Sequence, residues 1–260
     1  MLEYSLLGVV GLAIGSLGTL IGAGGGFILV PMLLLVYRNE APEIITGISL
    51  AVTFANALSG SIAYARMKRI SYRYGLWFSA ATIPGAIVGA AVTAYIPRQT
   101  FNLVFALAML AAAVALFLRP SADDRAELGG PVRLSPSKLA IGIVISIGVG
   151  FVSSLLGIGG GIIHVPVLVR MLGFPVHAAT ALSHFILVFT VGAGTLEHVV
   201  SGEFAAGAWR AAALAAGALV GAQLGAWLST RVRGRAIIRM LAGGLALVGV
   251  RLIVLFFSGR

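Results

Sequence analysis

The sequence predicts an all-α polytopic membrane protein built from two repeats of inverted topology. Of its 260 residues, 59% are hydrophobic and only 10% are charged, whereas soluble domains carry about 25% charged residues. The apolar runs are mostly about 17 to 25 residues long, which is the length that a helix needs to cross a bilayer. A glycine- and proline-containing motif also occurs twice, beginning at Gly22 and again at Gly157, 135 residues later.

The repeat extends beyond this motif. The aligned pairs are "GAGGGFILVP" (Gly22) with "GIGGGIIHVP" (Gly157), "TGISL" (Thr46) with "TALSH" (Thr180), "GLW" (Gly75) with "GAW" (Gly207), and "GAIVGA" (Gly85) with "GALVGA" (Gly217). Each half then predicts five helical segments. They cover residues 5–21, 27–37, 44–65, 75–96 and 99–118, and then 139–156, 162–172, 177–199, 205–229 and 236–257.

The basic residues indicate how each half lies in the membrane. The loop "RMKRISYR" (66–73) follows the third segment of the first half, and its charge predicts a cytoplasmic position. The equivalent loop of the second half, "EHVVSGEF" (197–204), has no Lys or Arg, and the basic cluster "RVRGR" (231–235) comes one loop later. We therefore expect the halves to be inverted, with residues 1–119 as the first repeat, 120–137 as a cytoplasmic linker and 138–260 as the second repeat.

An inverted repeat requires each half to cross the membrane an odd number of times. The three longer segments supply three crossings, so the first two segments must enter and leave on the same side. The segment "FILVPMLLLVY" (27–37) spans only about 16 Å as a helix, roughly half of the hydrocarbon thickness. The sequence thus predicts a re-entrant hairpin in each half, with the glycines at its turn.

The glycine turns are the candidate binding site. Backbone unwound inside a membrane is tolerated only where protein or a water-filled cavity surrounds it. Transporters built as inverted repeats use such breaks to present the N–H groups of a half-helix to an anion. The predicted residues are Gly24, Gly25 and Gly26 in the first turn and Gly159, Gly160 and Gly161 in the second. Close packing of helices is the alternative role of these glycines, and Pro31 and Pro166 lie either in a first helical turn or at a kink.

Polar residues on the third segment of each half are the second part of the predicted site. Thr46, Ser49, Thr53 and Asn56 recur every three or four residues and therefore share one helical face. Thr180, Ser183 and His184 begin a similar face in the second half, where Thr190 aligns with Asn56. These groups can donate hydrogen bonds to an anion, or they can bond between and within helices instead.

Two histidines are candidates for handling a proton or the anion. His164 follows the second glycine run, and His184 lies within the third segment of the second half. An ionisable group inside a membrane is a functional candidate by default. Their first-half counterparts, Leu29 and Leu50, are apolar, so both histidines also fit a neutral role as partners of nearby carbonyl groups.

The duplicated motifs, each followed by a helix with scattered polar residues, resemble those of the TauE/SafE family of membrane exporters, usually called sulfite exporters. The resemblance covers essentially the whole chain and implies export of sulfite, organosulfonates or related small organic acids. Members commonly carry a Thr-Ser pair early in the third segment. Here Ser49 and Ser183 hold the serine place, but Ile48 and Leu182 precede them, which leaves the substrate within the family open.

Other functional classes fit the sequence less well. The predicted spans lack paired carboxylates, zinc-peptidase spacing and a serine elbow, so we expect no enzyme, cofactor or metal. The net charge of +10 lies in short loops without interleaved aromatic residues and does not predict nucleic-acid binding. We expect a secondary transporter of the cell membrane that exports a small anion by alternating access. Proton coupling and homo-oligomerisation stay open, and an anion channel and a non-transporting scaffold are the alternatives.

Overall fold

The computed structural model describes residues 2–117, 132–233, 236–237, 239–240, 242–244, 246–247 and 249–250, and the regular secondary structure of these residues is all helical. The first half contains α1 (Leu2–Ile21), α2 (Gly26–Val36), α3 (Pro42–Arg66), α4 (Tyr72–Thr93) and α5 (Arg98–Phe117). The second contains α6 (Pro136–Leu156), α7 (Gly161–Arg170), α8 (Val176–Val200), the 3-10 helix η2 (Glu203–Gly207) and α9 (Ala208–Leu228). Further helical residues follow within 236–250.

The all-α, polytopic prediction is confirmed. Among the described residues, six helices are long and apolar enough to cross a membrane, namely α1, α3, α4, α6, α8 and α9 apart from small differences at their ends. The helices end within three residues of the predicted segments. Residues 251–257 of the last predicted segment and residues 120–131 of the predicted linker lie outside the described residues. Pro136 and Ser137, also assigned to that linker, instead form the first turn of α6, after the N-cap Ser135.

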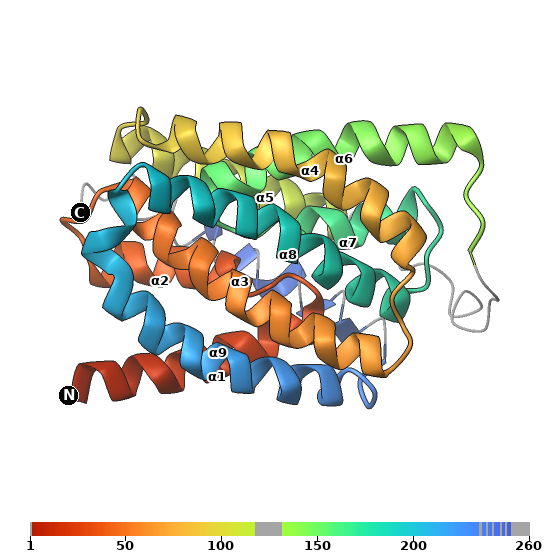
Figure 1. Ribbon diagram of the computed structural model, residues 1–260, viewed down its shortest axis with the longest axis horizontal. Helices are drawn as coiled ribbons and strands as arrows, with labels where there is room; N and C mark the ends of the chain where they lie inside the picture. Colours follow the sequence, from red (N-terminus) through yellow and green to blue (C-terminus); the bar gives the residue numbers. More distant parts are fainter. Residues whose placement is uncertain are drawn as a thin grey trace.

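The helices fall into two sets that run in opposite directions (Figure 1). A Cβ on Gly217 would meet Gly8, and a Cβ on Gly225 would meet Ser16, so α1 and α9 are parallel. Helices α4 and α6 are parallel by the same reasoning, because Gly142 lies next to Phe78 and Gly89 lies next to Phe151. Between the sets, α3 and α8 are antiparallel, because early α3 contacts late α8 through the pair Thr46 and His198. Hence α1, α3 and α9 run one way, and α4, α6 and α8 run the other.

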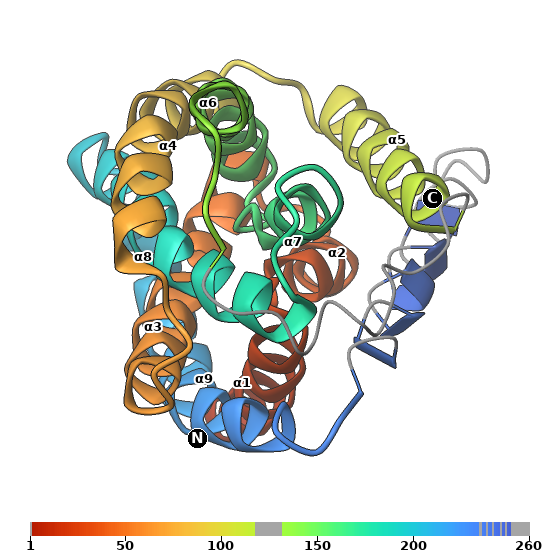
Figure 2. The same cartoon turned by 90° about the vertical axis from the view of Figure 1, so that its right-hand side faces the viewer.

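The first two helices of each half form a hairpin. The Tyr37 hydroxyl, at the end of α2, donates to Glu3 Oε1 at the start of α1 at 2.9 Å, so α2 returns toward the end from which α1 began. In the second half, Leu172 after α7 lies against Gly142 near the start of α6. Figure 2 shows α2 and α7 side by side in the middle of the bundle, with α5 set apart on one side. Pro31 and Pro166 both lie inside their short helices rather than in the first turn.

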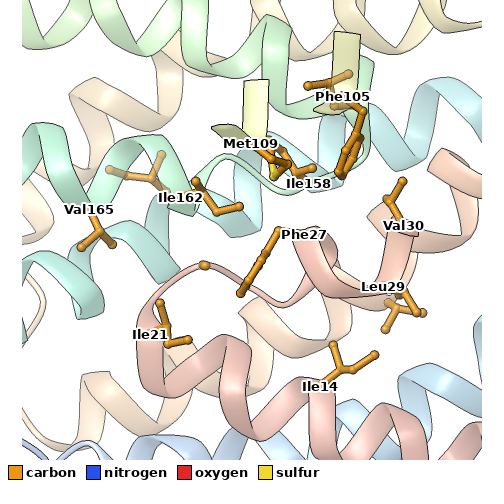
Figure 3. Packing of buried hydrophobic residues seen from close by; sticks show 14 of the residues in the cluster. Ile14, Ile21, Phe27, Leu29, Val30, Phe105, Met109, Ile158, Ile162 and Val165 are labelled. Atoms are coloured by element: carbon orange, nitrogen blue, oxygen red, sulfur yellow. The ribbon is translucent and has the colours of Figure 1, made fainter. Parts of the chain in front are cut away.

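Apolar side chains fill the space between the hairpin turns and α5. Phe27 lies among Ile21, Ile158 and Ile162, and Met109 and Phe105 of α5 border the same cluster (Figure 3). All of these side chains are buried. The turns are therefore covered by hydrocarbon on the α5 side, and polar groups reach them from α3, α8 and the hairpins themselves.

The charged residues divide unequally between the two ends of the bundle. Arg69 donates to Ser229 Oγ at 3.3 Å, so the loops after α3 and α9 share one end. That end carries Arg66, Lys68, Arg69, Arg73, Arg133, Lys138, Arg170, Arg231 and Arg233. The other end carries Arg38, Arg98 and Arg210 together with Glu3, Glu40, Glu43 and Glu197. The described residues thus place both predicted cytoplasmic basic loops together, and by the positive-inside rule we infer that their end is cytoplasmic.

A polar cluster holds the end of α2 at the opposite, glutamate-bearing end. The Arg98 guanidinium donates to the carbonyl of Leu34 at 2.9 Å and to that of Glu40, which satisfies carbonyls that the helix end leaves unpaired. Arg210 pairs with Glu40 at 2.8 Å and lies 4.1 Å from the centre of the Tyr37 ring. We call these contacts of Arg98, Arg210, Glu40 and Tyr37 the α2 clamp.

The equivalent place in the second half has an apolar contact instead. Leu172 lies 135 residues after Tyr37, and both Leu172 and Phe78 of α4 touch the position of a Cβ on Gly142. Nearby, the rings of Tyr74 and Phe174 meet edge to face with centroids 5.8 Å apart. The two hairpins are therefore fastened by different chemistry, charged at one end of the bundle and aromatic at the other.

Glycines let the parallel helix pairs touch backbone to backbone. A Cβ on Gly85 would lie 2.1 Å from the Ile147 carbonyl oxygen, and one on Gly221 would lie 2.2 Å from that of Leu12. Leu12 and Ile147 are equivalent at an offset of 135, so Gly85 corresponds in packing to Gly221. The sequence alignment of Gly85 with Gly217 is thus displaced by four residues, about one helical turn.

Two glycines of α6 provide a test of this packing. A Cβ on Gly150 would lie 2.2 Å from the Thr82 carbonyl oxygen, whereas one on Gly148 would meet nothing within 4 Å. We expect Gly150→Ala to destabilise the folded protein by about 1–3 kcal/mol or more, because α4 and α6 must separate. Gly148→Ala should keep or raise the stability, since alanine is the better helix former. Thermal unfolding in detergent measures both, and equal melting temperatures would contradict the close contact.

The chain contains no cysteine, so single cysteines introduced by mutation can test which loops lie at the same end of the bundle. Lys68 and Arg233 are exposed at the basic end, and Asn39 and Ser201 are exposed at the other. Lys68→Cys and Arg233→Cys should react with a membrane-impermeant maleimide only from the cytoplasmic side. Asn39→Cys and Ser201→Cys should react only from outside. Labelling of Lys68→Cys and Arg233→Cys from opposite sides would exclude the helix directions described here.

Candidate functional site

The two glycine turns meet in the interior of the bundle. A Cβ on Gly26 would lie 2.6 Å from the Gly157 carbonyl oxygen, and one on Gly161 would lie 2.2 Å from that of Gly22. No side chain fits at either position. Gly26 and Gly161 therefore serve the packing of one turn against the other, which was the alternative considered for these glycines from the sequence.

The neighbouring glycines give each turn its shape. Gly24, Gly25, Gly159 and Gly160 all have positive φ, between 72° and 90°, a region that other residues enter only with strain. Gly25 and Gly160 are the N-caps of α2 and α7, and neither helix has a side-chain cap. Both short helices thus begin at a bare backbone in the protein interior.

Several backbone donors at these helix starts have no acceptor. Within the described part of the chain, no hydrogen-bond partner accepts from the N–H groups of Gly25, Gly26 and Phe27, or from those of Gly159, Gly160 and Ile162. These residues are buried. Buried N–H groups are nearly always paired, and a helix start that presents them, with its positive dipole end, is a ready anion site.

The serines predicted to face the anion bond to the turns instead. Ser49 Oγ donates to the Gly157 carbonyl at 2.6 Å, and Ser183 Oγ donates to the Gly22 carbonyl at 2.9 Å. The exchange is reciprocal, because each serine fastens the turn of the other half. In this conformation the hydroxyl protons of Ser49 and Ser183 are therefore used to join the two halves.

Thr53 is placed between the two turns. A Cβ on Gly24 would lie 2.6 Å from its Cγ2 atom, and one on Gly159 would lie 2.7 Å from the same methyl group. Thr53 is fully buried, and its Oγ1 has no hydrogen-bond partner. Unlike the serines, Thr53 keeps a hydroxyl available beside the glycines.

Asn56 and His184 belong to one hydrogen-bond network. Asn56 Nδ2 donates to the Gly24 carbonyl at 3.0 Å, which leaves Oδ1 to accept from Thr19 Oγ1 at 3.0 Å. Since Thr19 donates its only proton there, it accepts from His184 Nε2–H at 3.1 Å. The network therefore assigns a proton to Nε2 of His184, and its Nδ1 has no partner among the described residues.

His164 and Thr190 are held elsewhere. His164 Nε2 lies 3.2 Å from Ser146 Oγ, which itself donates to the Gly142 carbonyl. Thr190 Oγ1 lies within hydrogen-bond distance of Thr82 Oγ1 in α4, at 2.8 Å, and of the Ile186 carbonyl in its own helix, at 3.0 Å. No hydrogen bond joins either side chain to a glycine turn among the described residues, although both are buried. Nor do three His, Asp or Glu side chains gather in a metal-binding group anywhere in that part of the chain.

Sequence reasoning missed Thr19 and Ser153, which lie in the last turn before the glycines. Thr19 joins the Asn56 and His184 network, and Tyr64 from α3 donates to the Thr19 carbonyl at 2.8 Å. Ser153 and Ser154 are fully buried, and their hydroxyls have no partner. Their position immediately before a helix break was the available signal, since polar groups there lie close to the unwound backbone.

Comparison with known proteins links this arrangement to a family. The model of the family described as Sulfite exporter TauE/SafE matches residues 7–252. The chain is 31% identical to the probable membrane transporter protein YunE of Bacillus subtilis, over 97% of this chain and 98% of the relative. It is 28% identical to a probable membrane transporter protein of Xylella fastidiosa, over 96% and 93% of the two chains. A similar protein of Methanocaldococcus jannaschii is 27% identical, over 77% and 74%. No solved structure matches the chain.

The network around Thr19 gives a stability prediction. Asn56→Leu removes the donor to the Gly24 carbonyl and the acceptor of the Thr19 hydroxyl proton, so we expect a loss of about 1–3 kcal/mol in the free energy of unfolding. His184→Leu should cost less, because Thr19 keeps its bond to Asn56. The other half also accepts Leu50 at the equivalent place, against Gly194 and next to Ser154. Thermal unfolding in detergent compares the two variants, and a larger loss in His184→Leu would show that the histidine, not Asn56, holds the turn.

Proposed function

The chain belongs to the TauE/SafE family of sulfite exporters, a family of membrane transporters, and we propose that it exports a small anion across the cytoplasmic membrane as a secondary transporter. The anion is sulfite, an organosulfonate or a related small organic acid. The observation that carries the proposal is the meeting of two uncapped helix starts inside the bundle. Their N–H groups at Gly25 to Phe27 and at Gly159, Gly160 and Ile162 lack acceptors among the described residues.

Negative charge is the ligand property that this arrangement favours. No carboxylate lies at the turns among the described side chains, since their glutamates, Glu3, Glu40, Glu43 and Glu197, lie at one end of the bundle. The helix dipoles of α2 and α7 both direct positive ends to the same point. In a low-dielectric interior such donors attract an anion much more strongly than they would in water.

Alternating access follows from the proposed inverted repeats. Equivalent helices run in opposite directions: α1 and α6 are antiparallel, as are α3 and α8, and α4 and α9. The reciprocal bonds of Ser49 and Ser183 join the halves at the turns. For an anion to enter or leave, one half must rock against the other and open the contact between the turns from one side at a time.

His184 is the residue that we propose for proton coupling. Its network reaches the Gly24 carbonyl through Thr19 and Asn56, so a change of its protonation would alter the hydrogen bonds at the first turn. His164 bonds to Ser146 on α6 and has no such link. If His184 carries the proton, transport by His184→Leu should no longer depend on a pH gradient.

Thr53→Val tests the site with little change of shape. Valine keeps the methyl group that lies between Gly24 and Gly159 but removes the unpaired hydroxyl. A hydrogen bond to a charged group contributes about 1.5–3 kcal/mol, so we expect the KM for anion efflux to rise about 10- to 100-fold. Efflux of sulfite, a small sulfonate and a carboxylate from proteoliposomes measures it.

Thr195→Val is the matched control, because Thr195 in α8 donates to the Val191 carbonyl of its own helix. Its kinetics should match those of the wild type. If the wild-type protein moved none of the three anions, the proposed function would be wrong. A flux that does not saturate with anion concentration and does not depend on any ion gradient would instead favour a channel.

A further inference from the structure

The second glycine turn carries a buried hydroxyl that the first turn lacks. Ser153 Oγ would lie 3.0 Å from a Cβ built on Gly160, the N-cap of α7. The side chain is fully buried, and its hydroxyl has no hydrogen-bond partner. We propose that Ser153 binds the substrate directly, and that the second turn is the half of the site that selects oxyanions. This proposal rests on the proposed anion transport.

The geometry excludes such a hydroxyl from the first turn. The counterpart of Ser153 at an offset of 135 is Gly18, whose Cβ would lie 2.4 Å from the backbone nitrogen of Gly25. The first turn therefore folds too closely onto α1 for any side chain at this position. The residue four positions earlier makes the same contact in both halves: Ile14 lies against Gly25, and Val149 lies against Gly160. At this position the second turn thus has a hydroxyl group where the first turn has none.

The usual structural use of a helical serine does not account for Ser153. Serine hydroxyls in apolar helices commonly donate to the carbonyl four residues earlier. Ser146 does so in the same helix, with Gly142 as its acceptor at 2.7 Å. Ser153 makes no such bond, and its hydroxyl lies against the turn instead. A polar group buried without a partner is unfavourable, and an anion at the start of α7 would supply the missing acceptor.

The donor set indicates the chemistry of the ligand. The unpaired N–H groups of Gly159, Gly160 and Ile162 belong to the same turn that Ser153 contacts. Several donors from different directions are best used by a ligand with more than one oxygen, such as sulfite, a sulfonate or a carboxylate. A monatomic halide cannot offer separate acceptor atoms to the hydroxyl and to the backbone. The second turn should therefore distinguish oxyanions from chloride.

Ser154 is a matched control for Ser153. It is the next residue, and it is likewise fully buried with an unpaired hydroxyl. However, Ser154 Oγ faces α8, 2.8 Å from the place of a Cβ on Gly194. Ser153→Ala and Ser154→Ala each remove one unpaired hydroxyl from the same helical turn, so both variants should fold with melting temperatures close to that of the wild type.

The experiment measures binding of sulfite, methanesulfonate and chloride to the purified full-length protein by calorimetry, and the KM for sulfite efflux in proteoliposomes. We expect Ser153→Ala to weaken sulfite and methanesulfonate binding about tenfold or more and to raise the KM equally. Chloride binding should not change. Ser154→Ala should bind all three anions as the wild type does.

Each result decides a different point. If the wild-type protein binds no anion, the proposed function itself fails. Wild-type binding with an unchanged Ser153→Ala variant would overturn only the assignment of Ser153. The assignment of Ser153 would also be wrong if Ser154→Ala lost as much affinity as Ser153→Ala, because the effect would then come from packing of the helix. A fall in chloride binding that parallels the fall in sulfite binding would overturn the assignment as well.

Discussion

Two breaks in the backbone inside an apolar bundle are the constraint on which the rest of this structure depends. Where α1 gives way to α2, and α6 to α7, peptide groups lose their helical partners in a place that water does not readily reach. The carbonyl groups find protein donors: Ser183 reaches Gly22, Asn56 reaches Gly24, and Ser49 reaches Gly157. The N–H groups at the starts of α2 and α7 do not find acceptors among the described residues. The breaks are thus left with an excess of donors, which is the physical basis for an anion site.

The same constraint explains the glycines. The two turns can share their polar groups only if they approach closely, and side chains at Gly26 and Gly161 would collide with the opposite backbone. Glycine is also needed where φ is positive, as at Gly25 and Gly160. Packing and the proposed anion binding are therefore compatible roles for these glycines. Close contact between the turns is what brings the unpaired donors of both halves to one place.

Local patterns predicted most of the fold. Apolar length and glycine position predicted the helices to within three residues, and the basic loops predicted which ends lie together. Hydrogen-bond partners that are distant in the sequence were harder to predict. A shared helical face could not reveal that Ser49 and Ser183 donate to glycine carbonyls while Thr53 does not. Similar glycine strings also misaligned α4 with α9 by a turn, because the helix contacts, and not the strings themselves, determine which glycines are equivalent.

The α2 clamp makes the two ends of the molecule respond differently to their surroundings. Arg210 and Glu40 attract each other through partly exposed charges, and dissolved ions weaken such attraction. The seam of Leu172, Phe78, Tyr74 and Phe174 at the basic end is apolar, and cooling rather than salt weakens contacts of that kind. Salt should therefore weaken the charged contacts at the glutamate-bearing end without weakening the apolar contacts at the basic end. The two ends of the fold thus differ in the kind of contact that fastens each short helix, charged at one end and apolar at the other.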